Sequence, residues 1–176
     1  MSNLRLINET EVTSSVSSVD ITDVFSADFD IYKITAETSS NSTSHFGANA
    51  RLINSSGSVI PNSIYDRALW RMRIDTTFGE IRFQNDTNLE SFFGTLDLNP
   101  EIATNVVYVF NPFSSSSYTF FLKQGMSLWS GFKASDKYIG VAKTTVSCTG
   151  YNVYSSNSNF FETGTVFRTY GLRVDS

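Results

Sequence analysis

Side chains that could act as nucleophiles or general bases are scarce in this chain. Nucleophilic catalysis needs a nucleophile, a base and a group that orients the base. The chain has a single histidine, His45, in the polar segment 42–46, and a single cysteine, Cys148. It lacks a Gly-x-Ser-x-Gly motif, and no histidine stands near Cys148 in the sequence to activate its thiol. We expect His45 in a surface loop and Cys148 as a small buried side chain, with no catalytic residue and no cofactor.

Acidic side chains suggest a ligand site or a catalytic pair in two places. In residues 86–90 (DTNLE) oxygen-bearing side chains alternate as in calcium loops, but the glycine and the distant bidentate glutamate of such loops are missing. Asp28 and Asp30 would share one strand face, as paired catalytic carboxylates do. The more common interpretations are a solvated turn and an edge that discourages mispairing. One histidine and one cysteine cannot build a zinc site, so we predict no metal.

Residues 67–74 alternate strictly between an apolar and a mainly basic set of side chains. The two sets are Ala68, Trp70, Met72 and Ile74 against Arg67, Leu69, Arg71 and Arg73. A period of two predicts a half-buried strand with the apolar set, Trp70 included, on the core side. The arginines, joined by Arg82, would then form a positive stripe for carboxylates of a neighbouring subunit or an acidic glycan. The alternative is a solvent-facing surface balanced by Asp66, Asp75 and Glu80.

Aromatic side chains outside the core could stack on sugar rings or on another subunit. Trp129 lies in the predicted loop 125–131, and loops are where binding residues concentrate. Tyr118 follows the serine run 114–117. The predicted interface or ligand contacts are therefore Arg67, Arg71, Arg73, Tyr118, Trp129 and Tyr151.

Composition narrows the class of protein. The 176 residues include 27 serines, 18 threonines and 14 asparagines, whereas charged residues are only 17% against a usual share of about a quarter. Aromatic residues are 14%, which excludes disorder for most of the chain. A net charge of −4 disfavours a nucleic-acid partner. No apolar run approaches the roughly 20 residues that cross a bilayer. We therefore expect a protein that is synthesised in the cytosol and does not insert into a membrane.

Short apolar and aromatic segments recur, separated by turn signals about every ten residues. Residues 51–54 and 58–60 flank Ser-Ser-Gly as in a hairpin, and residues 92–98 form a short strand that contains Gly94. Residues 106–110 are apolar on both faces and predict a central strand, with 118–124 as its hairpin partner. No segment has a helical period. The pattern predicts an all-β chain of about ten short strands, a sandwich or barrel, with two packed antiparallel sheets favoured.

The N-terminal segment differs from the rest of the chain. Residues 1–27 space single valines among hydroxyl side chains and bury little by themselves. We expect an extended arm or edge structure that pairs along a neighbouring sheet edge or another subunit. Residues 28–176 show no linker and form the sandwich domain, and the lone cysteine excludes a disulfide within the chain.

Five segments carry a resemblance that runs along most of the chain: 6–10 (LINET), 24–33 (VFSADFDIYK), 52–59 (LINSSGSV), 110–118 (FNPFSSSSY) and 164–172 (GTVFRTYGL). Together they resemble a family of structural proteins of tailed bacteriophages, especially marine and cyanobacterial ones. The ending Gly-Thr-x-x-x-x-Tyr-Gly-Leu is similar to that of many jelly-roll-like phage appendage proteins. None of these motifs is catalytic.

The resemblance implies a jelly-roll-like virion component that assembles in the host cytoplasm as a homo-oligomer, a trimer, on the capsid or tail. Subunit contacts would use residues 106–110 and 118–122, and the partners would be other virion proteins. A second hypothesis is a tail-fibre module that binds a receptor or host surface glycan through Trp129 and Tyr151. A third is a glycan depolymerase, for which the sequence offers no persuasive carboxylate pair.

Overall fold

The computed structural model describes residues 3–40, 46–75, 78–96, 102–129, 132–156 and 161–173. All the regular secondary structure in these ranges is β-strand, so the prediction of an all-β chain is confirmed. His45 lies outside the described residues. The strand bounds are β1 Leu4–Glu11, β2 Ser18–Ile21, β3 Ile31–Ser39, β4 Phe46–Asn54, β5 Tyr65–Arg73, β6 Gly79–Asp86, β7 Thr95–Leu96, β8 Ile102–Phe110, β9 Thr119–Trp129, β10 Phe132–Ala142, β11 Cys148–Ser155 and β12 Val166–Leu172.

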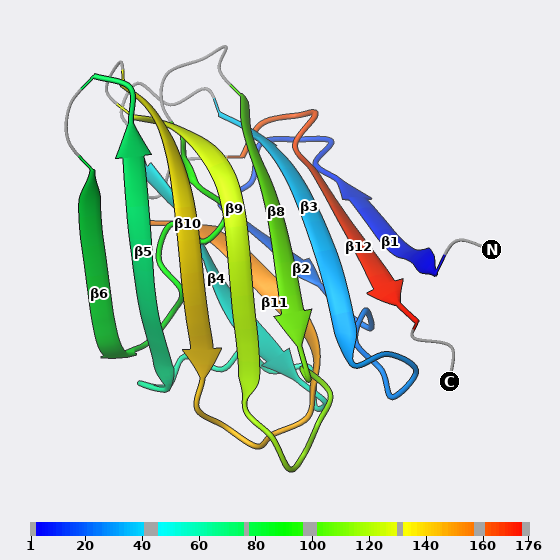
Figure 1. The fold of residues 1–176 in the computed structure, drawn as a ribbon. Helices are drawn as coiled ribbons and strands as arrows, with labels where there is room; N and C mark the ends of the chain where they lie inside the picture. Colours follow the sequence, from blue (N-terminus) through cyan, green and yellow to red (C-terminus); the bar gives the residue numbers. More distant parts are fainter. Residues whose placement is uncertain are drawn as a thin grey trace.

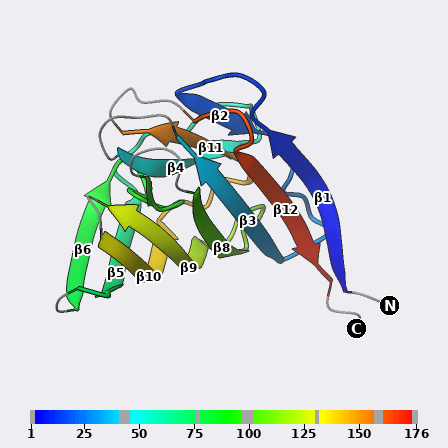
Figure 2. The same ribbon diagram turned by 90° about the horizontal axis from the view of Figure 1, so that it is seen from above.

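Two antiparallel sheets pack face to face, which confirms the β-sandwich. The large sheet has the order β1-β12-β3-β8-β9-β10-β5-β6 and crosses the view of Figure 1 from β6 on the left to β1 on the right. The small sheet has the order β2-β11-β4-β7. Seen from above, β2, β11 and β4 lie on one side of the large sheet (Figure 2). Strand β8 is fourth of eight in its sheet, the central position predicted for residues 106–110.

Eight of the strands have jelly-roll connectivity. The first and last strands pair, β1 with β12, and so do β2 with β11, β3 with β8 and β4 with β7. This is the pattern of one long hairpin wrapped into two four-stranded layers. The other four strands are insertions: β5 and β6 follow β4, and β9 and β10 follow β8. They join edge to edge and lengthen the large sheet, and we call them the sheet extension.

Turn chemistry explains two of the hairpins. The Asn54 side-chain oxygen accepts hydrogen bonds from the backbone N–H groups of Ser56 and Ser58, and Gly57 has a φ of 78° that favours glycine. The returning segment pairs with β4 by one bridge only, between Ile53 and Val59. In the serine run, the Ser114 hydroxyl accepts hydrogen bonds from two following backbone N–H groups. The predicted pairing of β8 with β9 is confirmed.

The core lies between the two sheets and is rich in aromatic rings. The Phe93 ring meets Phe167 edge-on, with centroids 5.5 Å apart, and Phe161 packs against Phe167 in turn. The Tyr32 hydroxyl donates to the carbonyl of Ser26 and accepts from its N–H, so this buried tyrosine keeps its polar atom satisfied. Because these side chains come from both sheets and the turns between them, the core forms only when the sheets close.

Two local predictions differ from the structure. Trp129 is the last residue of β9, so the predicted loop 125–131 is wrong for residues 125–129. Of the predicted strand 92–98, residues 97 and 98 lie outside the described residues. Within 92–96, Thr95–Leu96 forms a strand, and the buried rings of Phe92 and Phe93 lie in a turn just before it.

The extended N-terminal arm is not confirmed. β1 is an edge strand of the large sheet, paired with β12 of the same chain. β2 pairs with β11 in the small sheet, and the side chains of Val12, Ile21 and Phe25 belong to the core. Removing residues 1–27 would therefore take away two strands and part of the core.

Candidate contact surface and buried charges

Strand β5 turns its two sets of side chains the opposite way from the prediction. Arg67 and Leu69 are buried, whereas Trp70 is 52% exposed and Met72 is also exposed. Trp70 is therefore not a core residue, and the arginines do not form a solvent-facing stripe. The reason lies in the tertiary partners: carboxylates from other segments meet the basic side of β5, and a strand's own alternation does not show where they are.

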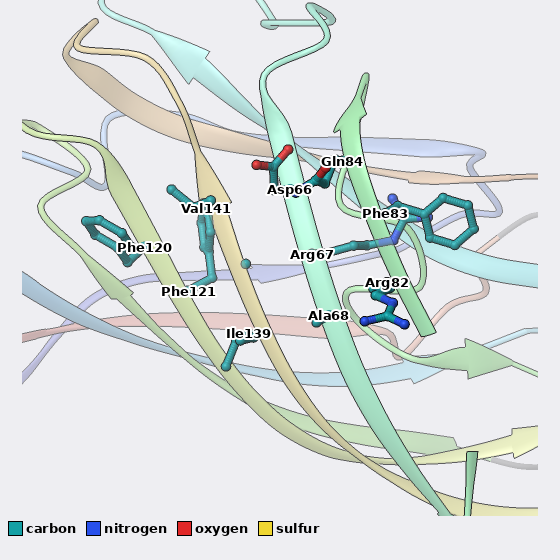
Figure 3. A pocket seen from close by; sticks show the side chains of 11 residues that line it. Asp66, Arg67, Ala68, Arg82, Phe83, Gln84, Phe120, Phe121, Ile139 and Val141 are labelled. Atoms are coloured by element: carbon teal, nitrogen blue, oxygen red, sulfur yellow. The ribbon is translucent and has the colours of Figure 1, made fainter. Parts of the chain in front are cut away.

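Arg67 is held inside the molecule by two acids of one turn. Its guanidinium pairs with the carboxylates of Asp86 and Glu90 and lies 4.3 Å from the centroid of the Phe83 ring. Figure 3 shows the Arg67 side chain reaching across β6 to that ring. The alternating oxygens of residues 86–90, which resembled a calcium loop, thus bind a guanidinium, the planar donor that suits carboxylates.

Arg71 belongs to a second buried cluster. Its Nε and one terminal nitrogen donate to the two oxygens of Asp136, at 2.8 and 3.1 Å. The Asp136 carboxylate also lies 3.6 Å from the Nζ atom of Lys123, and neither of these two side chains is exposed. Burial lowers the pKa of the Lys123 ammonium to about 8, although the Asp136 charge acts in the opposite direction.

The remaining charged groups near β5 are paired locally. Arg73 donates to both oxygens of Asp75, each at 3.0 Å. Asp75 is one of the acids that the sequence predicted to balance the arginines. Asp66 pairs instead with Lys143 of the segment after β10, at 2.8 Å, which lowers the pKa of the Asp66 carboxyl. The basic side chains predicted as one contact stripe are thus distributed among separate ion pairs.

The aromatic candidates have three different environments. Tyr118 is exposed just before β9. The Trp129 side chain lies outside the described part of the chain, although its backbone ends β9. Tyr151 is only 3% exposed: its ring stacks on Phe25, and its hydroxyl hydrogen-bonds the Thr169 hydroxyl at 3.0 Å. Tyr151 is therefore a core residue in this chain.

The other residues that the sequence offered for catalysis or metal binding are Cys148 and the pair Asp28 and Asp30. Cys148 is buried, as predicted, and burial raises the pKa of its thiol to about 11. Asp28 and Asp30 are exposed in the segment before β3, and the Ser26 hydroxyl donates to Asp28. No group of three or more histidine, cysteine, aspartate or glutamate side chains within the described ranges could hold a metal ion.

The outer face of the large sheet carries a band of apolar side chains that the strand register lines up. One cross-strand row contains Leu4, Leu172, Ile31, Phe110, Phe120 and Val141. The adjacent row contains Leu6, Tyr170, Lys33, Tyr108, Leu122, Ile139 and Ala68. These two rows, which we call the outer band, run together across six strands, from β1 to β10, near the lower ends of β8, β10 and β12 in Figure 1. Lys33 is the only charged side chain within those six strands. On β5 the first row ends at Asp66, and the second continues through Ala68 to Arg82 of β6.

The outer band is accessible where it crosses the sheet extension. Ile139 is 57% exposed, and Phe120 and Leu122 are exposed beside it. A hollow of about 790 Å³ opens here, lined by side chains from β9, β10, β5 and β6 (Figure 3). Its apolar wall includes Phe120, Ile139 and Val141, and Arg82 and Gln84 stand on the side of β6. Monomeric proteins rarely expose so continuous an apolar surface unless something covers it.

Sequence reasoning missed Lys123, Asp136 and the outer band. The segment 120–124 has apolar residues on both faces, so its alternation does not show that Lys123 points inward. The register of the β9–β10 hairpin shows what the sequence does not. It sets Gly125 opposite the buried Asp136, and Lys123, two residues before Gly125, lies on the same face of the sheet. The band appears only when the registers of six strands are known.

Comparison with known proteins gave no significant match to any protein-family model, curated protein or solved structure. Within the described residues, there is no helix that is both long and apolar enough to span a membrane.

Proposed function

We propose that this chain is a non-enzymatic structural protein of a tailed-bacteriophage particle. It decorates the capsid or belongs to a tail appendage, and it assembles through its own surface into a homo-oligomer, a trimer. One observation carries the assembly part of this proposal: the outer band is continuous across six strands and exposed on the sheet extension.

The physical argument for contact is the cost of leaving this surface in water. Each square ångström of apolar surface removed from water contributes roughly 25 cal/mol, and obligate subunit interfaces are rich in such surface. The residues predicted for subunit contact overlap with the band, since Phe110, Phe120 and Leu122 are all members. The virion setting is supported by the sequence resemblance of the five segments.

A purified sample tests the assembly directly by analytical ultracentrifugation. The wild-type chain is expected to sediment as a trimer at micromolar concentration. The variant Ile139→Glu puts a carboxylate at the centre of the exposed part of the band and is expected to give monomers. Burying an unpaired charge in an interface costs several kcal/mol.

A matched control is Ile74→Glu, which changes a more exposed isoleucine just beyond β5 and outside the band. It is expected to remain a trimer and to unfold at the wild-type temperature. The circular dichroism spectrum of the Ile139→Glu monomer should match that of the wild type, which shows that its fold is intact. A wild-type monomer at micromolar concentration contradicts the assembly proposal. Antibody labelling of intact particles of the encoding phage tests the virion setting, and unlabelled particles contradict it.

The hollow favours one second candidate, a tail-fibre module that binds a host surface glycan. Its volume of about 790 Å³ falls within the range of small-ligand sites, and Arg82 and Gln84 could donate hydrogen bonds to hydroxyl or carboxylate groups. Saturable binding of host polysaccharide to the immobilised protein, lost in Arg82→Ala, would support this candidate. No binding is expected if the surface only contacts other subunits.

A further inference from the structure

The inner face of the large sheet holds a row of polar residues that the proposed function does not use. The register sets Asn105 of β8 opposite Gly125 of β9, and Gly125 opposite Asp136 of β10. Asp136 in turn stands opposite Arg71 of β5. Lys123 lies two residues before Gly125 and therefore shares its face of the sheet. We call Asn105, Lys123, Gly125, Asp136 and Arg71 the buried polar row.

Asn105 presents an amide with one unused polar atom. Its Nδ2 atom donates to the backbone carbonyl of Phe93 at 2.8 Å. Its Oδ1 atom is buried and has no hydrogen-bond partner among the described residues. A Cβ atom on Gly125 would lie 1.9 Å from that oxygen and 2.7 Å from Cγ. The amide therefore lies directly over Gly125, in the space between β8 and Asp136.

Lys123 brings an amine to the same face of the sheet, beside Asp136. Its Nζ atom lies 3.6 Å from Asp136 Oδ2 and 3.5 Å from the backbone carbonyl of Ser91. Ser91 and Phe93, whose carbonyls contact the amine and the amide, belong to one turn that covers this part of the sheet. The amine and the amide thus contact backbone carbonyls two residues apart in one segment, from neighbouring strands.

Burial favours the uncharged form of this amine. Burial lowers the pKa of the Lys123 ammonium to about 8, so part of the population carries a free lone pair at neutral pH. Arg71 holds the Asp136 carboxylate with two hydrogen bonds, and that carboxylate lies beside Nζ. A neutral amine, an unsolvated amide carbonyl and a fixed carboxylate are the three groups that an amide exchange needs.

We propose that Lys123 and Asn105 form an intramolecular isopeptide bond, with Asp136 as the proton carrier. In water such an exchange is very slow, and here the fixed orientation of two groups on one sheet replaces a bimolecular encounter. The bond would tie β8 to β9 at the junction of the jelly roll and the sheet extension. It would give a covalent link to a chain whose single cysteine cannot form an internal disulfide.

The step balances without an outside reagent. Asp136 takes one proton from the Lys123 ammonium, and the amine lone pair forms a bond from Nζ to Asn105 Cγ. Asp136 passes this first proton to Nδ2 as the Cγ–Nδ2 bond breaks, so the nitrogen departs as ammonia, and Asp136 then takes the second proton from Nζ. Ammonia finally takes this second proton and leaves as ammonium, which restores the Asp136 carboxylate.

Mass spectrometry of the purified full chain tests the bond. The folded protein, incubated at pH 8, is expected to weigh one ammonia less than its sequence. Tandem spectra should then show a branched peptide that joins residues 105 and 123. The variant Asn105→Asp should form the same bond with loss of water and so reach the same final mass as the wild type. Asp136→Asn and Lys123→Met should each keep their full sequence masses.

Lys137→Met is the matched control, since this exposed lysine lies on the other face of β10 and its loss should leave the ammonia loss intact. If the row variants fail to fold, the wild-type chain still decides. A folded wild type that keeps its full mass overturns the proposal. So does an ammonia loss confined to an unbranched peptide, which would indicate a succinimide at an asparagine.

Discussion

Strands β3 and β5 are each nine residues long and lie in the same sheet, yet they bury opposite kinds of side chain. β3 buries Ile34 and exposes Glu37, the usual arrangement for a sheet with one covered face. β5 buries Arg67 and exposes Trp70. The same contrast separates the inner faces of the jelly roll and the sheet extension: the first buries mainly apolar and uncharged side chains, whereas the second contains buried ion pairs.

The difference follows from what meets each inner face. β3 faces the aromatic core between the sheets, where a charge would lack a partner. The inner face of the extension meets the carboxylates of the 86–90 turn and of Asp136, which pair with Arg67 and Arg71. The apolar rows on the outer face of the extension are the surface that we propose for subunit contact.

Breaking the buried cluster should have the largest effect on stability. Asp136→Ala leaves Arg71 and Lys123 inside the molecule without their shared acid. Removing one partner of a buried ion pair costs about 3–5 kcal/mol, and urea unfolding measures that loss. The control on β3 is Glu37→Ala, which removes an exposed partner of Arg168 and should cost less than about 1 kcal/mol. Equal losses in the two variants would contradict the comparison.

Filling the space over Gly125 should have the next largest effect. In Gly125→Ala the new methyl group would meet the Oδ1 and Cγ atoms of Asn105, which must move out of the space over Gly125. Overpacking of this kind costs about 1–3 kcal/mol. Gly79 lies opposite Arg71 in the same cross-strand row, but a Cβ there meets nothing within 4 Å. Gly79→Ala should therefore leave the free energy of unfolding within about 0.5 kcal/mol of the wild type.

The free energy of unfolding should depend on pH in a variant whose Lys123 amine is not consumed by an isopeptide bond. We choose Asn105→Ala, in which no isopeptide bond can form. Because the pKa of Lys123 is lowered to about 8 in the folded chain, the unfolded chain binds more protons above that pH. The free energy of unfolding should therefore rise with pH from about 8 to about 10, by at most about 1.4 kcal/mol per pH unit.

The comparison for this titration is the double variant Asn105→Ala, Lys123→Met. Asp136, Arg71 and Tyr138 face Lys123 in both variants, and the pKa of the Tyr138 hydroxyl is raised by burial, so this group stays neutral throughout. Cys148 titrates alike in both. Only the variant with Lys123 should gain stability with pH, and parallel curves from urea unfolding at each pH would refute the prediction.

Changes on the outer band should have the smallest effect on the folded monomer. Leu122→Thr alters a side chain that is exposed in the single chain, and its cost in monomer stability should stay below about 1 kcal/mol. The same change should weaken self-association, measured as a higher dissociation constant by sedimentation. A loss of monomer stability as large as that of Asp136→Ala would show that Leu122 belongs to a closed core.

The strands themselves could be predicted from the sequence, and their faces could not. Alternation, the turn residues of 54–58 and the proline and serines after Phe110 predict the strands and hairpins that the structure has. The contact residues were harder: Tyr151 looked available and is buried, whereas Ile139 was not considered and is exposed. Whether each side chain is covered depends on the segment that packs against its face of the sheet, and such segments are distant in the sequence.

The amino-acid sequence by itself determined that this protein is all-β, with a sandwich favoured over a barrel, because side-chain alternation and turn chemistry act over a few neighbouring residues. Only the tertiary structure decided that charges go inside the extension and apolar rows stay outside. Burial energy depends on the partner that a side chain meets, and Lys123 and Asp136 meet because β9 and β10 pair in one register. A shift of that register by one residue would turn every side chain of β10 to the other face.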